Sequence, residues 1–317
     1  MTPFAAYIPI GPAETEVIRA VDLINSLCAY EPSIPWIVLV DDSRDHRSLG
    51  RCLHVPSTCR LIILPHPRQT GHLDSRGGLC VADLVALDYI WKNLSADFVL
   101  KIDTDALVIA PFSQKIAQKF RQNRDAGILG LLGDSCHRQV RSFHSDRQVM
   151  RTIGSALLVT ERLKTHRPDA IAQLEALQIK TEEQRRNLVR VCEQISPIVE
   201  MDFKGEHCQG GAYAVSRETI GRMFDRGFLE DPLLWMSIPM GEDAMMGIYC
   251  ALVKLKSIDF SQHHDPFGIQ ARGLAYAPET LSQLGYSIIH SVKNDLQYSE
   301  AEIRQFFRLK RSQVMSA

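Results

Sequence analysis

An apolar strand that ends in two carboxylates is the stretch of this sequence best suited to chemistry. Residues 96–109 read ADFVLKIDTDALVI, in which an apolar run rich in β-branched residues predicts a buried strand that ends at Asp103 and Asp105. Residues two apart in an extended chain point to the same side, so these carboxylates can converge on one object. At the carboxyl edge of an α/β sheet they suit a divalent cation and the phosphates that it carries. The same pattern also fits a strand that ends in a solvated acidic turn.

Two further pairs of residues stand at the ends or beginnings of strands. Asp41 and Asp42 close a second short apolar strand, so acids follow two separate strands. Gly210 and Gly211 enter a later strand, where adjacent glycines allow a ligand to approach the backbone closely. A structural bulge explains the two glycines equally well.

Charged residues also occur near the carboxyl end of the chain. Glu242 and Asp243 stand at the start of a helical pattern, where acids also act simply as caps of the free amides. His290 closes a short strand, and Lys293 follows three residues later, where a cation can lie beside a phosphate. A histidine that closes a strand is also common as a structural residue.

Strand and helix patterns alternate along the chain and must position these residues. Helices are expected to begin near residues 14, 78, 242 and 299, and charged helical sequence over residues 161–200 is expected to form an insertion. Besides the strand that ends at Asp103, the expected strands are residues 4–10, 36–40, 61–64, 127–132, 154–160, 256–260 and 286–289.

Short strands that are apolar throughout and alternate with helices imply right-handed crossovers and a mostly parallel sheet covered on both faces. The predicted fold class is therefore α/β. Ligands of such sheets lie outside the carboxyl ends of the strands, which is where the four strand-end acids Asp41, Asp42, Asp103 and Asp105 are expected.

Composition excludes several classes of protein. The 317 residues carry a formal net charge of -1, which argues against nucleic acid as the main partner. The first ten residues do not resemble a secretory signal, and no apolar run approaches the length of a membrane span. The 8 cysteines form no CxxC pair, which fits reduced thiols in a cytoplasmic protein. No GxGxxG follows the first strand and no phosphate-binding loop pattern occurs, which disfavours dinucleotide cofactors and P-loop NTPases.

Four features stand in order along the chain: Asp-x-Asp, Gly-Gly, Glu-Asp, and a late His with a Lys. In this order the sequence resembles GT-A-fold glycosyltransferases, most closely the fringe and β1,3-galactosyltransferase-like group. The segments that carry the resemblance are YIW at 89–91 with FVLKIDTD at 98–105, GGAYAVS at 210–216 and PMGEDAMMG at 239–247. Thr104 departs from the family pattern, which has an acidic residue there. The segment 161–200 has no counterpart in that pattern, and the membrane anchor typical of these Golgi proteins is not visible.

The resemblance implies a single GT-A domain over residues 1–317 that binds a nucleotide sugar, expected to be a UDP-sugar, with Mn²⁺ or Mg²⁺. It implies that Asp105 and His290 bind the metal and that Asp103 lies near the metal and the ribose. An oxygen, oxygen and nitrogen ligand set is compatible with Mn²⁺. Lys293 is expected beside the diphosphate, and Asp41 or Asp42 near the nucleobase.

The resemblance also implies roles on the acceptor side. Asp243 is expected to be the catalytic base, and Gly210 with Gly211 part of the wall around the donor sugar and acceptor. Trp235 is expected either to stack on an acceptor sugar or to pack in the core. Glu242 is expected either to bind the acceptor or to cap its helix.

The sequence therefore predicts a metal-dependent hexosyltransferase that moves a sugar from a nucleotide to an acceptor hydroxyl with inversion. The acceptor is expected to be a glycan, a lipid-linked molecule or a protein. Three alternatives stay open: a retaining transferase of the same fold, an aspartate-nucleophile phosphatase, and a sugar-nucleotide-binding protein without turnover. In the phosphatase Asp103 is the nucleophile and Asp105 the acid.

Overall fold

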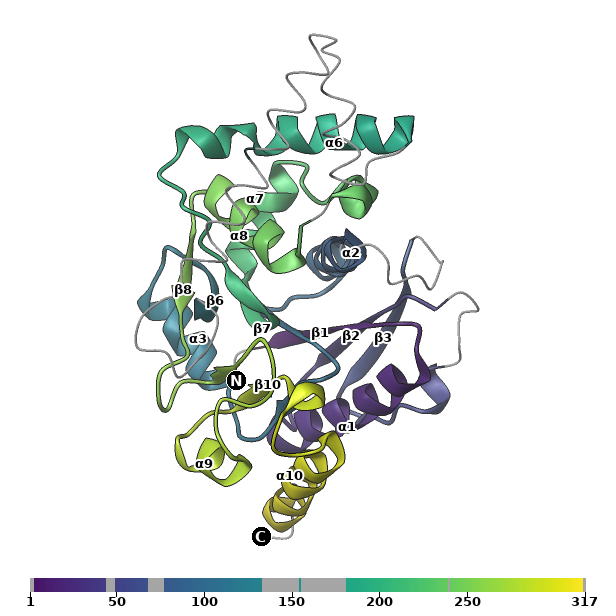
Figure 1. The fold of residues 1–317 in the computed structure, drawn as a ribbon, viewed down its shortest axis with the longest axis vertical. Coiled ribbons are helices and arrows are strands. Elements are labelled where there is room, and N and C mark those ends of the chain that lie inside the picture. Colours follow the sequence, from purple (N-terminus) through teal and green to yellow (C-terminus); the bar gives the residue numbers. More distant parts are fainter. Residues whose placement is uncertain are drawn as a thin grey trace.

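The computed structural model describes residues 3–43, 49–67, 77–132, 154, 181–238 and 240–315. Within them, a main sheet has the strand order β3-β2-β1-β4-β7-β6-β8 (Figure 1). Its strands are β1 (Phe4–Ile10), β2 (Trp36–Asp41), β3 (Arg60–Pro65), β4 (Phe98–Ile102), β6 (Ala126–Leu132), β7 (Cys208–Ser216) and β8 (Lys256–Asp259).

The main sheet is mostly parallel, as predicted. Strands β1 to β4 run parallel to one another, with β1 paired to both β2 and β4 and β2 paired to β3, and β8 is parallel to β6. Strand β7 runs antiparallel to both β4 and β6. The α/β fold class predicted from the alternating pattern is therefore confirmed, and the sequence pattern did not reveal the direction of β7.

Helices cover both faces of the main sheet (Figure 1). One face carries α2, α6, α7 and α8, and the other carries α1, α3 and α10. The helices are α1 (Glu14–Tyr30), α2 (Gly77–Asn93), α3 (Ser113–Gln122), α6 (Glu182–Ile195), α7 (Arg217–Asp225), α8 (Glu242–Leu252), α9 (Pro278–Gln283) and α10 (Glu300–Met315).

Strand β1 shows how one apolar segment serves both cores. Ala5 and Tyr7 belong to the apolar cluster under α2 and α8, whereas Ala6 and Ile8 belong to the cluster under α1. Successive side chains of a strand point to opposite faces of its sheet, so a strand covered on both sides is apolar throughout.

A second, three-stranded sheet brings the carboxyl-terminal part of the chain to the end of β4. Its strand order is β5-β10-β9, formed by Leu107–Val108, Ile288–His290 and Phe267–Ile269. Strand β10 is antiparallel to β5, with Ile289 opposite Leu107. Because β5 follows the Asp103–Asp105 turn, this pairing places His290 beside that turn.

The predicted helical insertion lies only partly within the described residues. Residues 182–195 form α6 and Ser196–Glu200 form a 3-10 helix, which agrees with the helical prediction. Residues 161–180 and the predicted strand at 154–160, apart from Gly154, lie outside the described residues. Strands β5 and β9 were not predicted, because two or three residues are too few to show a period. No helix in the described part of the chain is long and apolar enough to span a membrane.

Candidate active site

A pocket of about 360 Å³ lies outside the carboxyl ends of β1, β2 and β4. The chain passes from β1 to β2 on one side and returns to β4 on the other, which makes this edge a switch point of the strand order. Open α/β sheets bind ligands at such points, and the volume is that of a small-molecule site. The lining residues with polar side chains are Glu16, Asp42, His66, Asp103, Thr104, Asp105 and Lys293.

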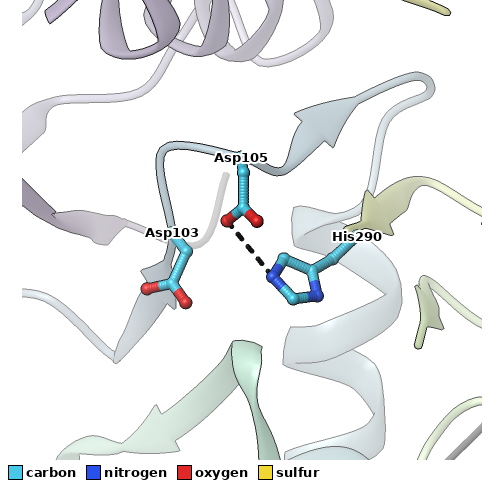
Figure 2. A group of neighbouring side chains, drawn as sticks. All are labelled: Asp103, Asp105 and His290. Carbon is cyan, nitrogen blue, oxygen red and sulfur yellow. Dashed lines mark ion pairs between the residues drawn. The ribbon is translucent and has the colours of Figure 1, made fainter. Parts of the chain in front are cut away.

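The two strand-end carboxylates and the late histidine meet at this edge. One ligand atom from each of Asp103, Asp105 and His290 lies within 4.8 Å of the others (Figure 2). Asp103 and Asp105 stand on the turn after β4, and His290 reaches them from β10. Asp103 Oδ1 is buried and lies 2.7 Å from Nζ of Lys101. Two carboxylates and an imidazole that converge in this way fit a divalent cation that accepts nitrogen ligands, such as Mn²⁺.

Asp105 is the most strongly paired of the three side chains. Its carboxylate lies 3.2 Å from Nε2 of His290 and 3.1 Å from Nζ of Lys293 and accepts a hydrogen bond from Ser291 Oγ at 3.0 Å. Burial opposes ionisation, but His290 and Lys293 outweigh it and lower the pKa of Asp105. Burial likewise disfavours the imidazolium, but Asp105 outweighs it and raises the pKa of His290. Asp105 is therefore a carboxylate at neutral pH.

The ring of His290 is oriented by its other nitrogen. Its Nδ1 lies 2.9 Å from the carbonyl oxygen of Gln270, which turns Nε2 toward Asp105. A partner of this kind sets the tautomer and orientation of a metal-binding imidazole. Gly211 provides the space for the ring, because a Cβ at this position would lie 2.3 Å from Nδ1 of His290.

Lys101 is a buried cation of the site that was not predicted. Its ammonium lies 2.7 Å from Asp103 Oδ1 and 3.0 Å from Glu242 Oε1, and it also contacts the carbonyl oxygen of Gly210. Burial disfavours this charge, but Asp103 and Glu242 outweigh it and raise the pKa of Lys101. The period of two in β4 was an available signal, since it points Lys101 to the same side as Asp103.

Glu242 faces into the protein rather than toward solvent. It is 6% exposed and pairs with Lys101, and a Cβ at Gly210 would lie 2.3 Å from its Oε1. Burial opposes ionisation, but Lys101 outweighs it and lowers the pKa of Glu242. The carboxylate is therefore engaged by a lysine, and binding of the acceptor or capping of the helix by Glu242 stays a prediction.

The adjacent Asp243 is half-buried, and its carboxyl group keeps a proton more readily than an exposed aspartate does. Its Oδ1 accepts a hydrogen bond from the backbone N–H of Ala244 at 2.8 Å. Burial and the neighbouring charge of Glu242 raise the pKa of Asp243. The two acids of the pair are thus distinct, since one is held as a charged partner of Lys101 and the other has a raised pKa.

Gly210 and Gly211 have defined neighbours, namely Glu242 and His290. Neither glycine lines the pocket at the carboxyl ends of the strands. Because these two positions carry no side chain, Glu242 and His290 can lie against β7. A place beside the donor sugar stays a prediction for both.

Trp235 packs in the core, so the expectation that it stacks on an acceptor sugar is wrong in this structure. Its side chain is 0% exposed, and its Nε1–H donates to the hydroxyl oxygen of Tyr249 at 2.7 Å. The two rings meet edge to face at 5.6 Å. An indole enclosed on all sides has no face to offer a ligand.

Of the two acids that end β2, only Asp42 lines the pocket. Asp41 accepts hydrogen bonds from the backbone N–H and hydroxyl of Ser43, which secures the chain as it leaves β2. His66, just after β3, was not predicted and stands beside Asp42, with Nδ1 3.7 Å from Asp42 Oδ1 and Nε2 2.9 Å from the carbonyl oxygen of Gly78. The sequence offered one signal for His66, which is its position directly after the end of a third strand, β3.

Comparison with known proteins finds similarity in structure only. No protein-family model matches the chain, and no curated protein matches its sequence. The bifunctional glycosyltransferase WbbM has a TM-score of 0.48 at 10% identity, covering 99% of this chain and 51% of that one. The galactosyltransferase LgtC, solved with donor and acceptor sugar analogues, has a TM-score of 0.45 at 11% identity, covering 98% and 95%.

A mannosyltransferase from Pyrobaculum calidifontis, solved with GDP-Man and Mn²⁺, has a TM-score of 0.39 at 12% identity and covers 82% of this chain and 55% of that one. The chain spans 24% of the length of S. aureus TarS and about half the length of WbbM. WbbM, LgtC and the Pyrobaculum calidifontis enzyme are glycosyltransferases by description, and the resemblance to the fringe-like subgroup is not confirmed.

Proposed function

We propose that this chain is a metal-dependent glycosyltransferase of the GT-A type, a single domain over residues 1–317 with residues 161–200 as an insertion. The observation that carries the proposal is the convergence of Asp103, Asp105 and His290 at the pocket outside the parallel strands. These residues come from segments about 185 positions apart in the chain, and the Asp-x-Asp and late histidine were singled out in the sequence for this role.

The reaction assigned to the site is transfer of a sugar from a nucleotide to an acceptor hydroxyl. A divalent ion bound there would stabilise the negative charge that grows on the leaving nucleoside diphosphate. Asp103, Asp105 and His290 would hold that ion, and Lys293, at the pocket rim, would contact the diphosphate. Asp42 lines the end of the pocket formed by β2 and would face the nucleoside.

Asp243 is the proposed general base. An acceptor hydroxyl has a pKa far above 7, so a placed carboxylate that takes its proton speeds attack on the sugar. The raised pKa of Asp243 makes its carboxylate a stronger base than an ordinary aspartate, whereas Glu242 is paired with Lys101. A base that activates the acceptor directly implies inversion of the sugar, with a retaining transferase as the alternative.

The donor and acceptor follow from the resemblance to the fringe and β1,3-galactosyltransferase-like group. A UDP-sugar with Mn²⁺ is the proposed donor complex, and a glycan, a lipid-linked molecule or a protein is the proposed acceptor. The ligand set of two carboxylates and one imidazole supports Mn²⁺ over Mg²⁺, since Mg²⁺ prefers oxygen ligands.

Calorimetric binding of UDP and of GDP, each with and without Mn²⁺, tests the metal assignment. Asp105→Ala and His290→Ala should abolish the Mn²⁺-dependent part of binding, because each removes a ligand atom. Asp88→Ala is the control, since Asp88 pairs with Lys92 on the surface of α2. Unchanged Mn²⁺-dependent affinity in both ligand variants would reject the site. Hydrolysis of an aryl phosphate without a sugar nucleotide would favour the phosphatase instead.

A further inference from the structure

The turn that carries the two carboxylates is restrained mainly by other parts of the chain. One backbone hydrogen bond closes the turn, from Ala106 N–H to Asp103 O at 3.0 Å. The carbonyl oxygen of Asp105 accepts from Val292 N–H at 2.9 Å, and that of Thr104 accepts from Arg304 Nη2 at 3.1 Å. Residues from the carboxyl-terminal end of the chain therefore fix the backbone on which the presumed metal ligands stand.

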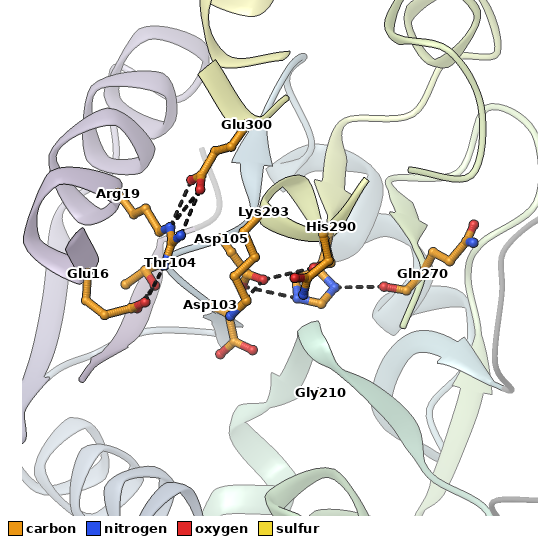
Figure 3. Close-up of polar contacts among 12 residues, drawn as sticks. Glu16, Arg19, Asp103, Thr104, Asp105, Gly210, Gln270, His290, Lys293 and Glu300 are labelled. Carbon is orange, nitrogen blue, oxygen red and sulfur yellow. Dashed lines mark hydrogen bonds and ion pairs between the residues drawn. The ribbon is translucent and has the colours of Figure 1, made fainter. Parts of the chain in front are cut away.

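Five residues form a closed ring around Thr104, part of which Figure 3 shows. The hydroxyl of Thr104 donates to Glu16, and Arg19 donates to Glu16 at 2.6 Å and to Glu300 at 2.8 Å. Arg304 donates to Glu300 at 2.8 Å and returns to the carbonyl oxygen of Thr104. We call this set, drawn from α1, the turn and α10, the Thr104 ring.

The charges of the Thr104 ring balance, with two arginines and two carboxylates. Arg304 is 8% exposed and also donates to Asp22 at 3.2 Å, while Arg19, Glu16 and Glu300 are at most 25% exposed. With its charges paired internally, the ring has the features of a support for the turn, and two of its members, Glu16 and Thr104, also line the pocket. Hydrogen bonds to charged groups in such partly buried positions contribute more than those at the surface.

Thr104 lies between the two presumed metal ligands, so any rotation of its peptide groups moves Asp103 and Asp105 relative to each other. Arg304 holds the carbonyl of Thr104 and the ring holds its hydroxyl, which restrains that rotation from two sides. Metal sites depend on ligands held in place by supporting hydrogen bonds.

We propose that helix α10 positions the metal-binding turn through Arg304, so that divalent-metal affinity depends on a residue that does not touch the ion. This inference rests on the proposed function, because it takes Asp103, Asp105 and His290 as the metal ligands. Arg304 is a positioning residue, acting through the carbonyl of Thr104 and the Thr104 ring.

Arg304→Met and Arg311→Met form a matched pair of variants in the full chain. Both remove one arginine from α10, both side chains are about one-tenth exposed, and both residues pair with Asp22. Arg311 lies 3.1 Å from Asp22, and no contact between it and the turn is recorded in the described part of the chain. Comparing the two variants separates the effect of losing the contact with the turn from the effect of losing a positive charge on the helix.

The measurement is binding of Mn²⁺ alone, followed by the electron paramagnetic resonance signal of free Mn²⁺, with unfolding by urea as a check on folding. Arg304→Met should weaken Mn²⁺ binding at least about tenfold, which is about 1.4 kcal/mol, and Arg311→Met should leave it within about twofold. Loss of a nearby positive charge by itself would tighten the binding of a cation. A weaker affinity in Arg304→Met therefore reports the position of the ligands.

Mn²⁺ affinity of Arg304→Met within about twofold of the unmodified chain would overturn the inference, as would an equal loss in Arg311→Met. If Arg304→Met does not fold, Thr104→Val removes the hydroxyl of the ring with little change in volume and should weaken Mn²⁺ binding as well. Unchanged affinity in Thr104→Val then overturns the inference. Absence of Mn²⁺ binding by the unmodified chain would overturn the proposed function together with this inference.

Discussion

Lys101 is the single side chain on which the buried charges of the site most depend. It lies between Asp103 and Glu242 and is itself 1% exposed. Without its ammonium, the buried carboxylate of Glu242 would lose its counter-charge and would face the carboxylate of Asp103. Removing one partner of a buried ion pair costs more than the pair contributes, because the other charge is left uncompensated.

Lys101→Met should lower the free energy of unfolding by about 3–5 kcal/mol, measured by urea denaturation. Lys92→Met is the matched control, since Lys92 pairs with Asp88 at 2.8 Å but is 51% exposed. Its effect should stay below about 1 kcal/mol. Equal effects of the two substitutions would show that Lys101 is not an essential partner of the site carboxylates.

Asp243 is the residue whose substitution tests the mechanism. Asp243→Asn keeps the shape of the side chain and its bond to Ala244 N–H but cannot accept a proton, so stability should change little. Transfer to the acceptor should fall by about 10²- to 10⁴-fold, with donor affinity preserved. Initial transfer rates and the anomeric configuration of the product are the measurements. Asp202→Asn, at a side chain that is 92% exposed, serves as the control.

Near-normal transfer by Asp243→Asn would reject the base assignment. A product that retains the configuration of the donor would reject inversion and favour the retaining alternative.

Among the elements, strand β7 limits where the ring of His290 can lie, because Gly211 of this strand is in contact with the ring. Gly211→Ala would place a Cβ 2.3 Å from Nδ1 of His290, and a methyl group cannot share that space with the ring. The imidazole must move away, and Mn²⁺ affinity should fall by about 10- to 100-fold, as when a metal ligand loses its support. Gly50→Ala is the control, because no atom of the described residues lies within 4 Å of the added Cβ. Equal Mn²⁺ titrations of the two variants would contradict this account.

At the scale of the whole molecule, one buried carboxyl links stability to pH. Asp83 on α2 accepts a hydrogen bond from the hydroxyl of Tyr213 and is 1% exposed. Burial, opposed by Lys101, raises the pKa of Asp83 to about 7. The unfolded chain releases this proton near its ordinary pKa of about 3.9. The folded state therefore binds the proton more tightly than the unfolded state over the interval between.

The stability that the protonated Asp83 provides is present below about pH 4 and is lost as the pH rises through about 7. Asp83→Asn cannot ionise, so the decline of unfolding free energy over this interval should become shallower than in the unmodified chain. Urea denaturation at several pH values measures the difference, with Asp88→Asn, at a side chain that is 26% exposed, as the control. Parallel curves for Asp83→Asn and the unmodified chain would show that Asp83 is ionised throughout.

Much of the framework of the site was predictable from the sequence, because it depends on short-range periodicity. The apolar strands and intervening helices indicated a mostly parallel sheet, and that sheet is present. Residues two apart on a strand end share a side, which brought Asp103 and Asp105 together in the prediction, and His290 was added through a family resemblance. All three meet in the structure.

Contacts between segments far apart in the chain could be known only from the folded structure. Periodicity shows on which side of a strand Lys101 stands but not that Glu242 lies opposite, and it cannot tell an enclosed Trp235 from an exposed one. The antiparallel direction of β7 and the ring that joins α10 to Thr104 arise in the same way. Each depends on how elements pack against one another, whereas local sequence patterns record only the face and the end of an element.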